Sequence, residues 1–278
     1  MKITTLIENM PDDGGKLAFE HGFSVFVEFD GKKILFDTGQ SGAFTNNAKK
    51  LGIHLSEADF VVLSHGHYDH TGGVPALLKE LRKKIPCYIG KEFFEPKYKL
   101  LEDNTYKYNG IPFSQELLEL KDSPVELVKV EEKVTWLTNC IVLFKNFARV
   151  SGFEEVNPKF FLKEEGRYVQ DYFVDEVALG LLTEQGLVLI AGCSHVGIVN
   201  ILEHVKKVLQ VPVVTVLGGT HLVEAGEERL EKTAEAFKAH GVTTVAVSHC
   251  TGEAGMELLR REFPDGFVLN NTGNVMEF

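Results

Sequence analysis

Seven consecutive residues, Ser64–His70 with the sequence SHGHYDH, constrain this chain more than any other stretch. Three histidines and one aspartate fall within six residues, directly after the apolar run Phe60–Leu63. An apolar run bounded by polar and glycine residues predicts a buried strand. A helical pattern follows over Ala76–Lys84, so the histidines lie on a strand-to-helix loop. Because loops of this kind carry the binding sites of open α/β sheets, the motif predicts a functional site there.

The spacing of these side chains favours metal binding. Residues two apart in an extended loop point the same way, so His65 and His67 can bind one cation. Asp69 and His70 are neighbours and project differently, so they can bind a second cation. Imidazole and carboxylate are ordinary zinc ligands, and imidazole also binds iron. The alternative is a solvated polar turn, and four ligand-type side chains directly after a strand make the metal site the better interpretation.

Three further apolar runs that predict strands are each followed by a histidine, at His195, His221 and His249. Together with the run before His65, four separate apolar strands thus end in histidine, and convergence of the four at one sheet edge is the simplest account of the pattern. A buried structural histidine is the alternative at each position. The histidines that lack this context, and that we expect at the surface, are His54, His204 and His240.

The motif and several segments along the chain together resemble the metallo-β-lactamase fold superfamily. The segments that carry this resemblance are Leu35–Gly39, the HxHxDH loop, Gly192–His195 and Ser248–His249. Others resemble a branch labelled as dihydropterin-related synthases, namely Glu20–Gly22, Asp175–Glu176, Gly192–His195 and Gly218–His221. The resemblance implies an α/β (α+β) fold, a four-layer αβ/βα sandwich with two mixed β-sheets, outer helices and metals at one edge.

The resemblance also implies a ligand set for two metal ions. The first ion would be bound by His65, His67 and His195, and the second by Asp69, His70 and His249. Zinc is the metal we expect, with two ions per chain, and iron or manganese is the alternative.

The chain departs from the superfamily pattern at one ligand. The superfamily supplies a bridging aspartate after a glycine, where this chain has Gly192 followed by Cys193. Asp175 falls near the place expected for the third-motif histidine. Cys193, Asp175 and His221 are therefore reserve ligands, although a free cysteine is more often a small core residue.

Roles for four more side chains follow from the same resemblance. Asp37 would orient neighbouring imidazoles, the alternative being a turn aspartate that bonds its own backbone. Asp69 would orient the nucleophile as well as bind metal. His221 would contact a substrate anion or protonate a leaving group, the alternative being a neutral buried histidine. His21 would face the site and contact substrate, or else lie in a capped loop.

Composition limits the partners and the compartment. The chain has 278 residues, of which 44% are hydrophobic and 25% charged, as in ordinary globular proteins. A net charge of −11 argues against broad binding of nucleic-acid phosphates. The first residues lack the basic start and apolar run of a signal peptide, and no stretch has the apolar length needed to cross a bilayer. The four cysteines form no CxxC pair, which indicates a reduced, cytoplasmic protein.

The chain is expected to form a single domain over residues 1–278. Residues 91–172, rich in aromatics, would be an insert that shapes the pocket for a small-molecule substrate. Packing within a hairpin is the alternative role for these rings. Whether the chain forms a homo-oligomer stays open.

Four functions fit these features. The first is a metal-dependent hydrolase that uses metal-activated water on a small phosphoester or related ester. The second is a dihydropterin-linked condensing synthase, suggested by the branch resemblance. The third is an iron-binding redox protein, which would be coloured when purified in air. The fourth is a metal-stabilised binding protein without turnover.

Overall fold

The computed structural model describes all 278 residues, and the chain divides into two compact units. The first unit comprises residues 1–130, 157–175 and 271–278, and the second comprises residues 131–156 and 176–270. Each unit contains one seven-stranded sheet. The expectation of a single domain stays a prediction.

The sheet of the first unit has the strand order β18-β1-β2-β3-β4-β5-β8. Its strands are β1 (Lys2–Ile7), β2 (Ser24–Phe29), β3 (Lys32–Phe36), β4 (Phe60–Val62), β5 (Ile85–Gly90), β8 (Val125–Val130) and β18 (Val275–Glu277). The run from β3 to β8 is parallel, whereas β1, β2 and β18 pair antiparallel. The sheet is therefore mixed, and the carboxyl ends of β3, β4 and β5 lie at the same edge.

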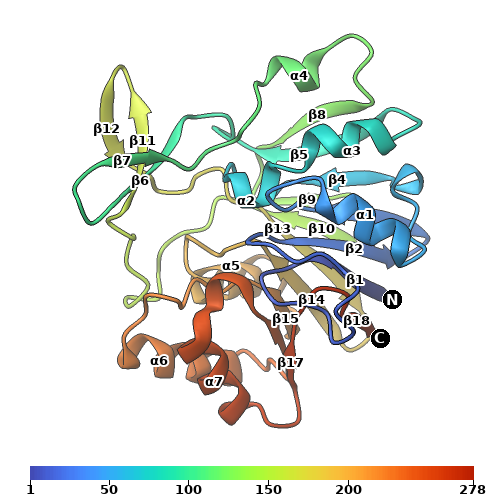
Figure 1. Ribbon diagram of the computed structural model, residues 1–278. Helices are drawn as coiled ribbons and strands as arrows, with labels where there is room; N and C mark the ends of the chain where they lie inside the picture. Colours follow the sequence, from blue (N-terminus) through green and yellow to red (C-terminus); the bar gives the residue numbers. More distant parts are fainter. The chain divides into compact units, whose positions relative to one another are not determined.

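Short helices lie along this sheet (Figure 1), and all but the one at Tyr68–Thr71 bury apolar side chains in the core of the first unit. They are α1 (Ala43–Lys50), η1 (Leu55–Glu57), α2 (Tyr68–Thr71), α3 (Val74–Glu80) and α4 (Glu116–Glu119). The predicted helix over residues 76–84 was wrong in its bounds. Helix α3 begins at Val74 and has a proline in its first turn, where a missing N–H costs little. It ends at Glu80 because Leu81 is extended and leads toward β5.

A separate four-stranded sheet also belongs to the first unit and projects away from the seven-stranded one (Figure 1). Its order is β12-β11-β6-β7, from β6 (Lys97–Leu100), β7 (Tyr106–Tyr108), β11 (Phe160–Glu164) and β12 (Arg167–Gln170). Tyrosine rings pack on one another across it: Tyr106 and Tyr168 are stacked, with centroids 3.6 Å apart. This sheet is built from the aromatic-rich part of the 91–172 segment, and the rest of that segment supplies strands to the two larger sheets.

The second unit has the strand order β17-β16-β15-β14-β13-β10-β9. Its strands are β9 (Val134–Trp136), β10 (Ile141–Phe144), β13 (Ala178–Thr183), β14 (Gly186–Ala191), β15 (Val213–Gly218), β16 (Thr244–Val247) and β17 (Phe267–Leu269). Strands β14 to β17 are parallel, and their near-continuous apolar sequences match burial on both faces.

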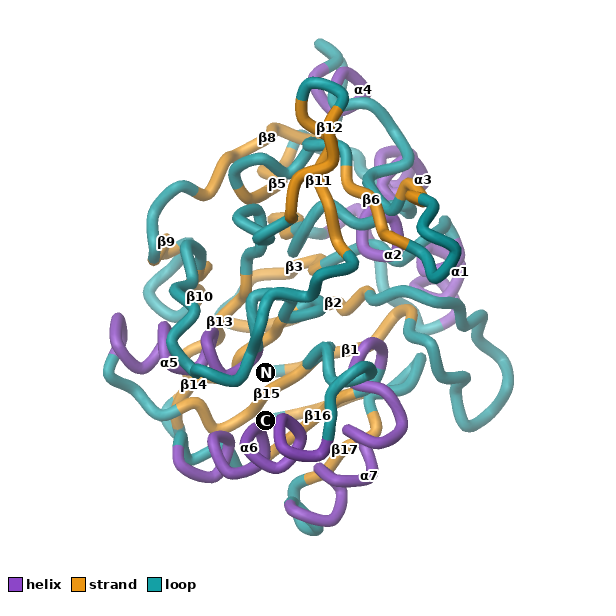
Figure 2. Tube along the Cα trace, turned by 90° about the vertical axis from the view of Figure 1, so that its left-hand side faces the viewer, coloured by secondary structure: helices purple, strands orange, loops and turns teal.

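Three helices and one short 3-10 turn complete the second unit. They are α5 (Ile198–Leu209), α6 (Glu227–Ala239), η2 (His249–Thr251) and α7 (Gly252–Glu262). Figure 2 shows α6 and α7 alongside the strands β16 and β17. The predicted bounds of α5 and α6 agree with the structure, because both helices have clear apolar periodicity.

One of the histidines expected at the surface is buried. His204 is only 8% exposed, since it lies on the face of α5 that also carries Ile201 and Val205. Its Nε2 lies 3.1 Å from the carbonyl oxygen of Lys133, and its ring packs edge-on against Phe147. The surface prediction for His204 was therefore wrong, and helical periodicity was the signal that should have placed it inside.

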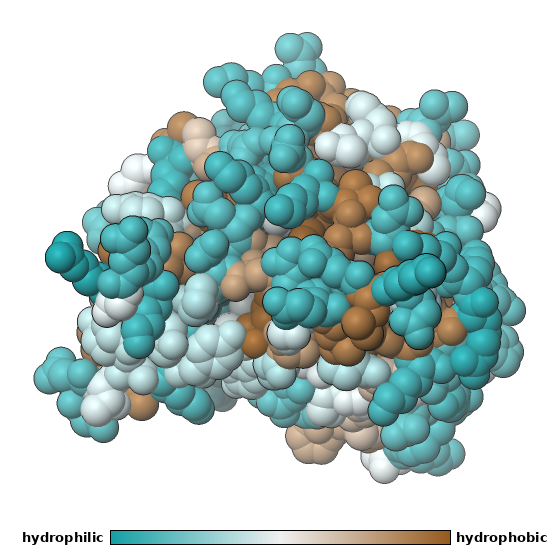
Figure 3. Space-filling model, turned by 90° about the horizontal axis from the view of Figure 1, so that it is seen from above, coloured by the Kyte–Doolittle hydropathy of each residue, from teal (hydrophilic) through white to brown (hydrophobic).

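Several large apolar side chains of the first unit are exposed, among them Leu101, Tyr108, Leu120, Tyr172 and Val174. Figure 3 shows apolar side chains gathered near the middle of one face, within a hydrophilic surround. None of the helices has both the length and the apolar character needed to cross a membrane.

Candidate metal centre

The candidate ligands of the first unit lie on loops that follow parallel strands. Asp37 comes directly after β3, and the motif Ser64–His70 follows β4, its neighbour in the sheet. Strand β4 carries only buried side chains, so the chain emerges from the core at the sheet edge. All four ligand-type side chains of the motif are at most 5% exposed. A solvated polar turn, the alternative for this segment, does not describe them.

The histidines of the motif face one another. Nε2 of His65 lies 3.1 Å from Nδ1 of His67, and the rings of His65 and His70 are 4.3 Å apart between centroids. Burial, with the nearby charges of His70 and His67, holds the pKa of His65 well below its ordinary value. The imidazole of His65 is therefore neutral at pH 7, which is the form that binds metal.

Asp37 sets the orientation of His70. Its carboxylate is fully buried, and Oδ2 lies 2.7 Å from Nδ1 of His70. The amide and the hydroxyl of Ser64 both donate to the same carboxylate, each at 2.7 Å. Burial raises the pKa of Asp37, and the contact with His70 opposes this shift. A bond to Nδ1 leaves Nε2 as the metal-binding atom, as a carboxylate partner commonly does for a ligating histidine.

Asp69 and His21 form the exposed side of this cluster. Oδ2 of Asp69 lies 3.2 Å from Nε2 of His21 and 3.7 Å from Nε2 of His70. His21 is half exposed, whereas Asp69 is buried. Asn9 holds the other side of the His21 ring, with Nδ2 3.2 Å from Nδ1. His21 therefore combines contact with a candidate ligand and access to solvent, as a substrate-binding residue requires.

The second unit brings together its own set of candidate ligands after three adjacent parallel strands. His195, His221 and His249 follow β14, β15 and β16, respectively. The rings of His195 and His221 are 4.4 Å apart, and Sγ of Cys193 lies 3.2 Å from Nε2 of His249. All four side chains are at most 8% exposed. Three of the four strand ends expected at one sheet edge thus lie together in the second unit, whereas β4, which precedes His65, belongs to the sheet of the first unit. The joining of the two sets around shared ions stays a prediction.

Glu176 holds the His195 loop and was not assigned a role from the sequence. Its two carboxylate oxygens accept hydrogen bonds from the backbone amides of His195 and Val196, both at 2.8 Å. Arg149 donates to the carbonyl oxygens of the same two residues. The position of Glu176 just before a buried strand is the sequence feature that could have identified it, because a buried carboxylate needs hydrogen-bond partners.

Asp175 accepts hydrogen bonds from two other residues of the first unit. Its Oδ2 accepts a hydrogen bond from the amide of Gly66, at 2.8 Å, and its Oδ1 accepts one from Nζ of Lys97, at 3.0 Å. Both oxygens of this reserve ligand thus have partners other than a metal. No sequence signal singled out Lys97, because a lysine within a short strand normally faces solvent.

Left-handed backbone conformations mark the strand ends of both sets. Asp37, His221 and His249 have φ angles of 58°, 48° and 53°. Such values are uncommon outside glycine and are strained for most side chains. Strain of this kind gathers at functional sites, where the surrounding structure maintains it.

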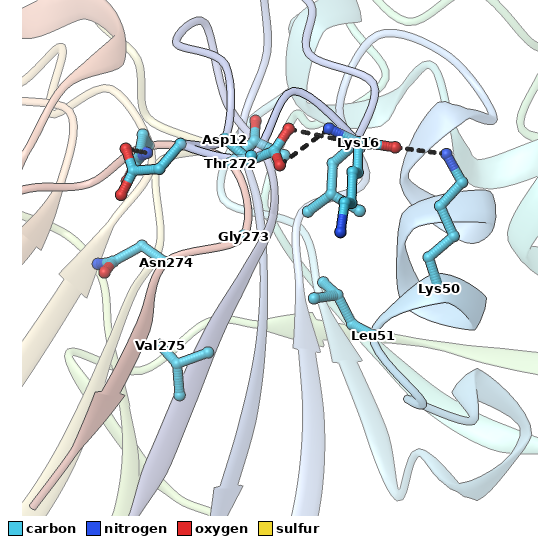
Figure 4. A pocket seen from close by; sticks show the side chains of 12 residues that line it. Asp12, Lys16, Lys50, Leu51, Thr272, Gly273, Asn274 and Val275 are labelled. Atoms are coloured by element: carbon cyan, nitrogen blue, oxygen red, sulfur yellow. Dashed lines mark hydrogen bonds between the residues drawn. The ribbon is translucent and has the colours of Figure 1, made fainter.

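A hollow of about 730 Å³ in the first unit lies among other residues. It is bordered by the loop that contains Asp12 and Lys16, by Lys50 and Leu51 at the end of α1, and by residues 271–275 (Figure 4). Asp12 accepts hydrogen bonds from the amides of Lys16 and Leu17, and Nζ of Lys50 donates to the carbonyl of Lys16. No histidine or cysteine lines this hollow, so it is not the candidate metal centre.

Buried imidazoles, a buried carboxylate partner and a thiol at the ends of parallel strands are side chains that could hold a metal ion in this α/β fold. The model of the metallo-beta-lactamase superfamily matches residues 17–198, and the chain belongs to this superfamily. The fold and the relatives indicate an enzyme of that superfamily.

Two relatives are similar to this chain over its full length. One is the 7,8-dihydropterin-6-methyl-4-(beta-D-ribofuranosyl)-aminobenzene-5'-phosphate synthase of Methanocaldococcus jannaschii, 30% identical over 100% of this chain and 97% of that protein. The other is the solved structure of Tm1679, a metal-dependent hydrolase of the beta-lactamase superfamily. It is 33% identical, with a TM-score of 0.85, over 100% of this chain and 99% of that one. A diphosphatase of the PhnP family shares the fold alone, at 14% identity and a TM-score of 0.57 over 100% and 97% of the two chains.

Proposed function

We propose that this protein is a metal-dependent hydrolase that cleaves a small phosphoester or a related ester. The observation that carries the proposal is the buried HxHxDH loop with His70 held by Asp37, in a chain of the metallo-beta-lactamase superfamily. The similarity to Tm1679, described as a metal-dependent hydrolase, supports the same reaction class. The net charge of −11 supports a small-molecule substrate over a nucleic acid.

Two zinc ions are proposed as the resident metals. The ligand sets are His65, His67 and His195 for one ion, and Asp69, His70 and His249 for the other. The donors fit zinc because they are imidazoles, a carboxylate and a thiol, all buried. The 3.2 Å separation of Cys193 and His249 supports Cys193 as the residue that replaces the usual bridging aspartate.

When bound, such ions supply Lewis acidity and a water of lowered pKa. The chain's own residues then orient the reactants. Asp69 holds the nucleophile in place, and the half-exposed His21, 3.2 Å from Asp69, contacts the substrate. His221 neutralises a substrate anion or donates a proton to the leaving group. The four cysteines, none of which forms a disulfide, support a reducing compartment such as the cytoplasm.

Metal analysis combined with an ester screen tests this proposal. Elemental analysis of purified protein should find zinc, and a panel of phosphomonoesters, phosphodiesters and carboxylic esters should contain a substrate. His67→Ala should lose bound metal and activity together. The loss in metal affinity should exceed the roughly 10–100-fold that is typical when a residue supporting a ligand, rather than the ligand itself, is replaced. His54→Ala, at an exposed histidine, is the matched control. Full metal content and full activity in His67→Ala would show that the ligand assignment is wrong.

A condensing synthase is the second candidate. The name of the M. jannaschii relative favours it, because it describes the synthase of a compound that contains a dihydropterin and a ribofuranosyl-aminobenzene phosphate. The stacked tyrosines of the small sheet show that this part of the chain accommodates packed planar rings. Incubation with a reduced pterin and an aminobenzene riboside phosphate, followed by mass spectrometry, separates the two functions. Formation of a C–N bond with no hydrolysis of the ester panel would favour the synthase.

A further inference from the structure

Lys97 is a lysine that the first unit buries almost completely. It lies on β6 and is 2% exposed. Its Nζ lies 2.9 Å from Oδ2 of Asp171 and 3.0 Å from Oδ1 of Asp175, and both of these carboxylates are also buried. Lysine is almost never buried unless it is paired, because an isolated ammonium in an apolar interior is very costly. The fold thus contains, at this position, a buried ammonium whose desolvation is costly.

The charges of the three groups depend on one another. Burial opposes the charged form of Lys97, but Asp175 and Asp171 outweigh it and raise the pKa of Lys97 above its ordinary value. Burial raises the pKa of Asp175, and Lys97 opposes that shift. Removal of the ammonium would therefore leave two buried carboxylates without their cation, which is strongly destabilising for the arrangement that they form.

Asp175 connects this network to the metal loop. Its Oδ2 accepts the hydrogen bond from the amide of Gly66, the residue between His65 and His67. Gly66 is also closely enclosed, because a Cβ there would lie 2.3 Å from the carbonyl oxygen of Phe93 and 3.2 Å from Cε of Lys97. The Gly66 peptide thus has little room to move, and its orientation decides where the two adjacent imidazoles point.

Asp171 connects the same ammonium to the rings that flank these imidazoles. Its Oδ1 accepts a hydrogen bond from the amide of Phe173, at 2.7 Å, and Phe173 has a φ of 55°. The Phe173 ring contacts His67 edge-on, with centroids 5.5 Å apart, and Nζ of Lys97 lies 5.2 Å from the centre of that ring. Lys97 therefore acts on Phe173, which packs against His67, in two ways: directly at the ring and through the Asp171 carboxylate at the amide.

We infer that Lys97 is a positioning residue for the metal loop, which acts through Asp175 on the Gly66 peptide and so sets the geometry of His65 and His67. This inference rests on the proposed metal binding and adds to it a residue that itself binds no metal. A network that only holds β6 in place would stabilise the fold without changing the affinity for metal. Metal affinity in the folded state, compared with stability, distinguishes the two roles.

The experiment compares cobalt(II) and zinc(II) affinity, by chelator competition, in wild type, Lys97→Met, Asp175→Asn and the double variant. Lys107→Met, at an exposed lysine of the same small sheet, is the control. Lys97→Met should bind each metal about 10–100-fold more weakly, with an altered visible spectrum of the cobalt(II) form. Because Lys97 acts through Asp175, the double variant should lose less affinity than the sum of the single losses. Lys107→Met should match wild type.

Several outcomes would overturn the inference. A folded Lys97→Met with wild-type affinity and cobalt(II) spectrum would assign Lys97 a structural role alone, and additive losses would exclude the route through Asp175. If Lys97→Met does not fold, the Asp175→Asn variant provides the test instead. Asparagine keeps an oxygen that can accept from the Gly66 amide but removes the charge that pairs with Lys97. An unchanged metal affinity in Asp175→Asn would then overturn the inference. Wild-type protein that binds neither metal would instead refute the proposed function, and the inference with it.

Discussion

At the scale of single residues, the buried carboxylate of Asp37 carries the most specific claim about the site. It accepts hydrogen bonds from Ser64 and holds His70 at 2.7 Å, with no exposure to solvent. Asparagine keeps the shape of aspartate and tolerates the left-handed backbone at this position. It removes the charge that favours one orientation of the His70 ring. Asp37→Asn should therefore weaken zinc binding by about 10–100-fold, measured by competition with a chromophoric chelator.

The control for Asp37→Asn is Asp122→Asn, at an exposed aspartate of the same unit. It should leave zinc affinity unchanged. Equal affinities in wild type and Asp37→Asn would mean that Asp37 is a turn residue without influence on His70.

His204 provides a pH-dependent test that does not involve the candidate ligands. Burial lowers the pKa of His204, and the hydrogen bond to the Lys133 carbonyl only partly opposes this. Because the folded pKa lies below the unfolded value of about 6.5, the unfolded chain binds the proton first as pH falls. The stability contributed by neutral His204 is complete above that value and is lost as pH falls toward the folded pKa. In His204→Gln the melting temperature should fall less steeply between pH 7 and pH 5.

Melting curves of metal-free wild type and His204→Gln at several pH values provide the measurement for His204. The exposed His54 offers the control, and His54→Gln should follow the wild-type curve. Parallel pH profiles for wild type and His204→Gln would contradict the assignment of a lowered pKa.

At the scale of elements, helix α5 has an unusual start. It lacks a capping side chain at its N-cap residue Gly197, and the distant Glu154 caps it instead. The carboxylate of Glu154 accepts hydrogen bonds from the amides of Val199 and Asn200, at 2.9 and 2.8 Å. A negative charge is stabilising there because the first turn of a helix exposes unsatisfied amides and the positive end of the dipole.

Glu154→Ala should lower the free energy of unfolding by about 1–2 kcal/mol, the usual cost of a lost helix cap. Urea unfolding followed by circular dichroism measures this loss. Glu155→Ala, at the adjacent exposed glutamate, should change stability by less than about 0.5 kcal/mol. A loss of the same size in both variants would show that the effect does not come from the cap.

The elements themselves were largely predictable from local pattern. The apolar runs before His65, His195, His221 and His249 are strands, and α5 and α6 have the predicted bounds. Periodicity identifies these elements because each helix buries one apolar stripe and the apolar strands are buried on both faces. It failed at the start of α3, where Val74 and Pro75 belong to the first turn of the helix rather than preceding it. It also failed at His204, a polar residue that lies on the buried face of α5.

At the scale of the whole molecule, bound metal should stabilise the native state. Ligands that bind the folded but not the unfolded chain add about 2.7 kcal/mol at a concentration 100 times the dissociation constant. Removal of metal with a chelator should therefore lower the melting temperature, and readdition of zinc should restore it. Differential scanning calorimetry gives both values. His67→Ala should show a smaller response to the chelator, and an equal response would place the stabilising metal elsewhere.

By itself, the sequence determined the strands that precede the candidate histidines, the helices α5 and α6 and the superfamily. Each of these depends on residues close together in the chain, where side-chain periodicity and motif spacing act. Only the tertiary structure decided which polar groups are partners. Gly66 meets Asp175 from 109 positions away, Lys97 meets Asp171 from 74, and Glu154 caps a helix 45 residues further on. Such pairs form because buried charges and amides must be satisfied by whatever group the folded chain brings near, and no local pattern encodes that choice.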